Sequence, residues 1–65
     1  MELVKIQFQT PQDLTGFRKV VKSQIQEFNI AGLFIICQCS KEEIAKAMNH
    51  FGGRVIESYI NRQEN

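Results

Sequence analysis

Two cysteines one residue apart are the side chains in this sequence best suited to chemistry. Thiolates of Cys37 and Cys39 on one strand face could bind a soft metal, with His50 or Met48 as further ligands. A zinc site normally uses Cys-x₂₋₄-Cys spacing and four ligands, whereas this chain has one Cys-x-Cys pair and a single His. We therefore expect no metal site. Both cysteines should be reduced core thiols whose parallel side chains, about 6–7 Å apart, cannot form a loop-closing disulfide.

The other groups that could act on a substrate have structural explanations. His50 falls near the end of an expected helix, where an imidazole stabilises exposed carbonyl groups. Gly52-Gly53-Arg54 could cradle a phosphate, but phosphate loops precede a helix N-terminus and this one follows a C-terminus, where the dipole is negative. No nucleophile can be paired with a base. The sequence thus predicts a protein with no catalytic residues and no cofactor.

Arg18, Lys19 and Lys22 form the best candidate contact with nucleic acid. Proteins that bind single strands add exposed aromatic side chains that stack on bases, and most of the five Phe residues here are assigned to the core. The chain has 8 Lys and Arg against 7 Asp and Glu, so its net charge of +1 attracts neither nucleic acid nor an acidic membrane. Nucleic-acid binding is therefore one alternative function, a metal or redox site at Cys37 and Cys39 is the other, and a solvated helix face is the expectation for the basic cluster.

Length and composition indicate one domain over residues 1–65. A chain of 65 residues supports a single small core, and a partner chain would help to cover it. Hydrophobic residues make up 43% and charged residues 23%, as in globular proteins. The N-terminus lacks a secretory pattern, and the longest strongly apolar run, Ile30 to Cys37, is far shorter than the ~20 residues that span a bilayer. We expect a cytoplasmic protein without membrane contact.

Hydrophobic periodicity predicts a strand followed by a long helix in the first half of the chain. Leu3–Phe8 alternates apolar and polar residues, as a half-buried strand does. Three residues indicate a helix start. The hydroxyl of Thr10 can cap free backbone N–H groups, Pro11 has the backbone angle of a first helical residue, and the charge of Asp13 favours the positive end of the helix dipole. Spacings of three and four residues define its apolar stripe, which consists of Leu14, Phe17, Val21, Ile25 and Phe28. Asn29–Gly32 is the expected turn out of this helix.

The second half of the chain is expected to begin with a strand and a helix. Leu33–Cys39 does not alternate, which is typical of a central strand covered on both faces. Ser40 and Glu43 have the spacing of a capping box, so the helix starts at Lys41. Gly52-Gly53 supplies the left-handed residue that ends it. Its buried stripe is Ile44, Ala47 or Met48, and Phe51.

A third strand, Arg54–Ile60, completes the expected fold, and the polar Asn61–Asn65 should fray. Each helix lies between two strands with short connections, which favours parallel strands. With Leu33–Cys39 central, right-handed crossovers put both helices on one face. The prediction is a two-layer β-α-β-α-β fold of the α/β class, with a three-stranded, mostly parallel sheet. The rival ferredoxin-like arrangement needs a fourth strand, for which the sequence offers no obvious residues.

The sheet face away from these helices would be uncovered. Gln38 is the only polar residue inside the middle strand, so Phe34, Ile36 and Gln38 are assigned to this open face. The inward residues of the same strand are then Leu33, Ile35, Cys37 and Cys39. The last strand would add either Val55 with Tyr59 or Ile56 with Ile60.

An apolar open face of a few hundred Å² exceeds what isolated monomers usually show. We therefore expect a non-enzymatic interaction module, a homodimer or a protein that binds a protein partner. Its predicted interface residues are Phe34, Ile36, Gln38 and Tyr59.

Overall fold

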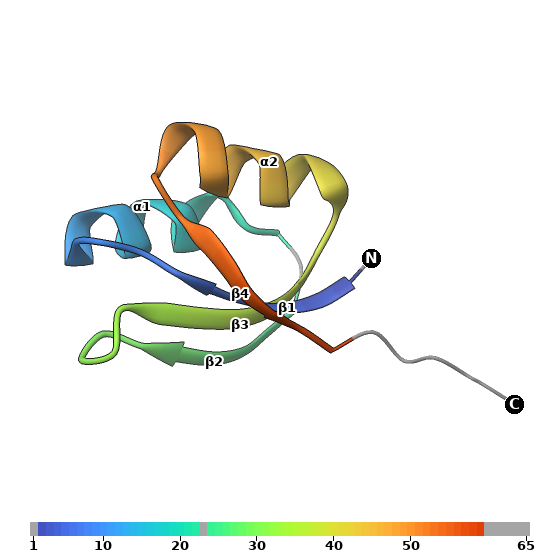
Figure 1. Ribbon diagram of the computed structural model, residues 1–65, viewed down its shortest axis with the longest axis horizontal. Helices are drawn as coiled ribbons and strands as arrows, with labels where there is room; N and C mark the ends of the chain where they lie inside the picture. The colour runs from blue at the N-terminus through green and yellow to red at the C-terminus, as the bar shows by residue number, and fades with distance from the viewer. Residues whose placement is uncertain (1, 23, 60–65) are drawn as a thin grey trace, which may run out of the picture.

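The chain forms a four-stranded antiparallel sheet with two helices on one face (Figure 1). The computed structural model describes residues 2–22 and 24–59. Its elements, in chain order, are β1 (Glu2–Gln7), α1 (Pro11–Val20), β2 (Ile25–Asn29), β3 (Phe34–Cys39), α2 (Lys41–His50) and β4 (Arg54–Ser58). The strand order is β2-β3-β1-β4, so β1 and β3 are central and β2 and β4 are the two edges.

The predicted three-stranded, mostly parallel sheet is wrong. All three strand pairs, β1 with β3, β1 with β4 and β2 with β3, run antiparallel. The additional strand is β2, whose residues were predicted to belong to the first helix. The resulting βαββαβ order is that of ferredoxin-like folds, the arrangement set aside for want of a strand. Ile60 and the tail Asn61–Asn65, for which predictions were made, lie outside the described residues.

A bulged strand explains why the first helix was predicted to be too long. Ile25 and Phe28 are three residues apart, a spacing that continues a helical stripe. In the structure Ile25 lies beside Cys37 and Phe28 beside Ile35, with a register shift between Ile25 and Glu27. The extra residue of the bulge turns both apolar side chains to the same sheet face. A three-residue spacing thus arises here from a strand.

The predicted turn at Asn29–Gly32 exists, but it joins β2 to β3. The N–H of Gly32 donates to Oδ1 of Asn29 at 2.7 Å, and the N–H of Leu33 donates to the carbonyl of Ile30 at 3.2 Å. Leu33 has a φ of 60°, in the left-handed region that costs a side chain about 1–2 kcal/mol. Its carbonyl accepts from the N–H of Phe8 at 2.8 Å, which fixes the hairpin to the end of β1.

The predicted helix starts are confirmed. The hydroxyl of Thr10 accepts from the N–H of Asp13 at 3.1 Å, with Pro11 in the first turn of α1. Ser40 and Glu43 form the capping box of α2. Gly52, with a φ of 66°, is the left-handed residue that follows α2, as predicted.

The core lies between the helices and one face of β1 and β3. Its buried residues are Val4, Ile6, Phe8, Leu14, Phe17, Val21, Ile35, Cys37, Cys39 and Ala47. This burial confirms the faces predicted for both central strands. Gly16 allows the helices to approach, because a Cβ there would lie 2.9 Å from the ring of Phe51.

Glu43 joins the start of α2 to the segment that follows α1. Its Oε1 accepts from the N–H of Ser40 at 3.0 Å, and its Oε2 accepts from the N–H of Lys22 at 3.1 Å. One carboxylate therefore satisfies backbone donors from two parts of the chain. Charged acceptors of this kind form stronger hydrogen bonds than neutral ones.

Replacing Glu43 with Ala should lower the free energy of unfolding by about 1–3 kcal/mol, because the N–H groups of Ser40 and Lys22 lose their acceptor. Glu42→Ala is the matched control, since Glu42 is exposed in the same helical turn. Its effect should stay within about 0.5 kcal/mol. Urea unfolding followed by circular dichroism measures both, and equal effects of the two substitutions would contradict the bridging role.

Candidate interaction surface

The open face of the sheet is partly covered by its own side chains. Phe34 and Ile36 on β3 are half-buried, and Gln38 is exposed. The ammonium of Lys5 on β1 lies 4.3 Å from the centre of the Phe34 ring, a cation–π contact. The predicted apolar patch is therefore smaller at its centre than the sequence suggested.

The charges on the open face balance. The strand register places Lys5 beside Ile36 and Glu57, Glu27 beside Ile36, and Arg54 beside Gln7. Two cations and two carboxylates thus share this face. Such a surface does not attract a polyanion, and it is electrostatically compatible with a neutral protein surface.

Tyr59 follows β4 directly and is 41% exposed. Its N–H donates to the carbonyl of Leu3 at 2.7 Å, which continues the pairing of β4 with β1. Its hydroxyl donates a hydrogen bond to the carboxylate of Glu57, and this bond raises the pKa of Tyr59 above its usual value. Desolvation and the negative charges of Glu57 and Glu27 act in the same direction. The phenol is therefore neutral at physiological pH, as a contact residue requires.

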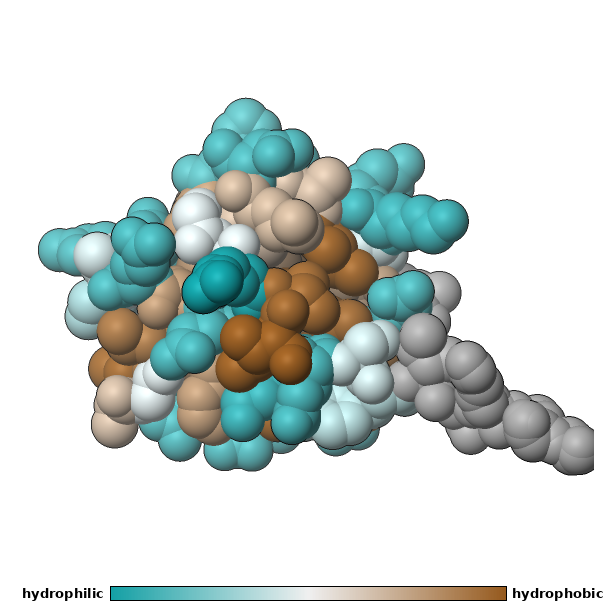
Figure 2. Space-filling model, viewed as in Figure 1, coloured by the Kyte–Doolittle hydropathy of each residue, from teal (hydrophilic) through white to brown (hydrophobic). Residues whose placement is uncertain are grey.

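The most exposed apolar side chains gather around β4. Val55 is 37% exposed, Ile56 43% and Met48 on α2 51%, in addition to Tyr59. We call these four residues the β4 edge surface. Figure 2 shows hydrophobic surface at the centre of this view, where β4 lies in front.

Met48 belongs to this surface because of its position on α2. Glu43, which accepts from Lys22, marks the side of α2 that faces α1. Met48 follows five residues later and so projects roughly 140° further round the helix. It therefore lies away from α1. Of the two residues considered for the buried stripe at this point, Ala47 is the buried one.

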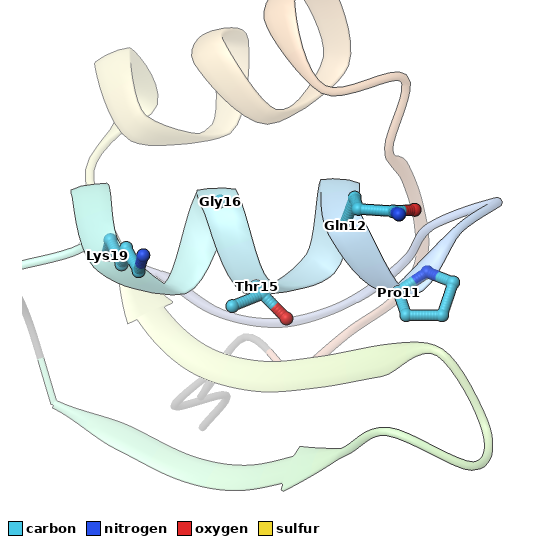
Figure 3. Close-up of a pocket in the computed structure, with 5 residues that line it drawn as sticks. All are labelled: Pro11, Gln12, Thr15, Gly16 and Lys19. Carbon is cyan, nitrogen blue, oxygen red and sulfur yellow. The ribbon is translucent and has the colours of Figure 1, made fainter.

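The basic cluster predicted on the first helix is divided in the structure. The guanidinium of Arg18 lies 4.8 Å from the centre of the Phe28 ring on β2. Lys19 lines an open groove of about 390 Å³ along α1, whose other lining residues are Pro11, Gln12, Thr15 and Gly16 (Figure 3). Lys22 lies beyond the end of α1, near Glu43. The three residues thus have different neighbours, and the groove holds a single cation among neutral groups.

The prediction of two reduced cysteines is wrong. Cys37 and Cys39 are joined by a disulfide, with their Cα atoms 5.8 Å apart. The bulge of β2 lies beside this part of β3. Bulges increase local twist, and strongly twisted strands have a shorter rise per residue, which brings the two side chains closer than in an ideal strand.

The weak metal candidates are not brought together. Both disulfide sulfurs belong to fully buried residues, while His50 is exposed at the end of α2. Residues 2–22 and 24–59 contain no group of three or more His, Cys, Asp or Glu side chains that could hold a metal ion. Within the same residues, no helix has the length and apolar character needed to cross a membrane.

Comparison with known proteins adds no relative. No protein-family model, curated protein or solved structure matches this chain. The surface must therefore be interpreted from its own geometry. The sequence had pointed to Val55, Ile56 and Tyr59 as open-face alternatives, but it had no signal that β4 would be an edge strand. That position depends on β2, which the helical spacing had concealed.

The two faces of β3 predict opposite results for neighbouring substitutions. Ile35→Asp should unfold the protein, because it places a carboxylate in the core, where Ile35 is fully buried. Phe34→Asp should leave the fold intact, because position 34 is partly exposed beside Lys5. Circular dichroism melts of both variants test this. A folded Ile35→Asp with an unfolded Phe34→Asp would contradict the face assignment.

Reduction of the disulfide should lower the free energy of unfolding by about 1–2 kcal/mol, a small effect because the closed loop is so short. Thermal melts with and without a phosphine reductant measure this difference. A Cys37→Ala, Cys39→Ala variant is the control and should not respond to the reductant. If denatured, unreduced protein takes up two alkyl groups, the disulfide assignment is contradicted.

Proposed function

We propose that the chain is a non-enzymatic interaction module whose partner is a second copy of itself. The character of the interior supports this proposal. Among the described residues no polar or charged side chain is buried. Catalytic sites place such groups in clefts that alter their pKa values, and small-molecule sites fix their ligands with a few convergent polar groups.

One observation carries the proposal. Among residues 2–22 and 24–59, five large apolar side chains are exposed; four of them make up the β4 edge surface, and the fifth, Ile30, lies in the β2–β3 turn. Exposed apolar side chains that gather on one side mark contact sites more often than scattered ones do. A small chain gains the most from such a contact because its own core is limited.

The predicted interface residues Phe34, Ile36, Gln38 and Tyr59 remain part of this proposal. Tyr59 connects the open face to the β4 edge surface, since it follows β4 and bonds to Glu57 on the open face. Nucleic-acid binding receives no comparable support, because the open face carries balanced charges and the basic cluster is divided.

The cytoplasmic location expected from the sequence is also a proposal. Stable disulfides are uncommon in the reducing cytosol, so the Cys37–Cys39 bond argues against this location. A fusion to a fluorescent protein would show the compartment directly.

Multi-angle light scattering at micromolar concentration tests self-association. The expected mass is twice the 7.5 kDa of one chain. Dilution should shift the mass towards that of one chain, as mass action requires. A constant mass of 7.5 kDa up to millimolar concentration would contradict the proposed function.

A further inference from the structure

We infer that the second copy adds to β4 as an antiparallel strand, so that two four-stranded sheets become one continuous sheet across a twofold axis. This inference rests on the proposed function and specifies its interface. It follows from the backbone of β4, from the side chains around it and from the charges along it.

The outer edge of β4 has backbone groups directed away from the sheet. The N–H of Tyr59 donates to Leu3 on β1. In an antiparallel strand, consecutive residues direct their N–H and C=O groups to opposite sides. Those of Ser58 therefore point away from β1, and Ser58 is exposed. An edge of this kind is a template for another strand.

The side chains around this edge are suited to a dry contact. Val55 and Ile56 are β-branched residues of high strand propensity, and both side chains are exposed. The opposite edge differs, because Arg18 covers Phe28 on β2 and the exposed residues of that strand are Gln26 and Glu27. Of the two edges, β4 is the one left uncovered and apolar.

The charges on β4 match those of an antiparallel second copy. Arg54 is at the start of the strand and Glu57 is near its end. Because paired copies of β4 run antiparallel, the Arg54 end of each strand lies beside the Glu57 end of the other. The two arginines are then far apart. A second copy thus pairs opposite charges twice.

The same arrangement ends at two copies. A twofold contact uses the β4 edge of both chains, which leaves only the β2 edges, with exposed Gln26 and Glu27, at the ends of the joined sheet. The geometry therefore favours a closed dimer.

Ser58→Pro tests the strand pairing directly. Proline removes the outward N–H of Ser58 and should leave the bonds to β1 in place, as at other edge positions. Ser58→Ala is the matched control because it keeps the N–H. Sedimentation equilibrium should show the dimer dissociation constant raised at least about tenfold by proline and changed less than about threefold by alanine. Circular dichroism establishes that each variant is folded.

Ile56→Lys provides a second variant should proline unfold the chain. It replaces an exposed apolar side chain of β4 with an ammonium group in both copies, close to the joined edges, and should also raise the dissociation constant at least about tenfold. Folded variants that dimerise like the parent chain would overturn the β4 pairing. If Phe34→Asp alone then gives monomers, self-association stands and the interface is the open face. A parent chain that is monomeric at every concentration overturns both the pairing and the proposed function.

Discussion

The structure depends on the burial of one face of the two central strands. Val4 and Ile6 on β1 lie beside Cys37 and Ile35 on β3, and all four side chains are sealed beneath the helices. Burial of a Val or Ile side chain contributes roughly 1.5–3 kcal/mol, whereas a hydrogen bond between neutral groups contributes roughly 0.5–1.5 kcal/mol. A one-residue slip of either strand would turn these residues to water, so this face also determines the register.

The two edges of the sheet follow from this arrangement. With β1 and β3 at the centre, β2 and β4 must be edge strands, and two helices of ten residues each cannot cover both equally. On β2, the guanidinium of Arg18 from α1 lies over the Phe28 ring. On β4, Val55 and Ile56 are exposed, and Met48 on α2 is exposed and apolar as well. The chain thus completes its core and retains one incomplete edge, which is the physical reason to expect a second copy there.

Local signals in the sequence predicted the helix starts, the turn and the buried faces, because each depends on residues close together in the chain. Thr10 and Ser40 cap nearby N–H groups, and Asn29 holds the turn at Gly32. The strand order and the disulfide were not predictable in this way. The strand order includes β2, where the bulge gives Ile25 and Phe28 a helical spacing, and the disulfide joins two residues whose separation in an ideal strand is too large. Periodicity does not distinguish a bulged strand from a helix over so few residues.

Hydrogen exchange at two neighbouring amides tests the central claim most directly. The N–H of Tyr59 donates to Leu3 within one chain, so it should be protected at every protein concentration. The outward N–H of Ser58 should exchange rapidly in dilute solution and become protected as the concentration rises and the β4 strands pair. Equally fast exchange of the Ser58 amide at all concentrations, in a sample shown to contain dimers, would contradict the account.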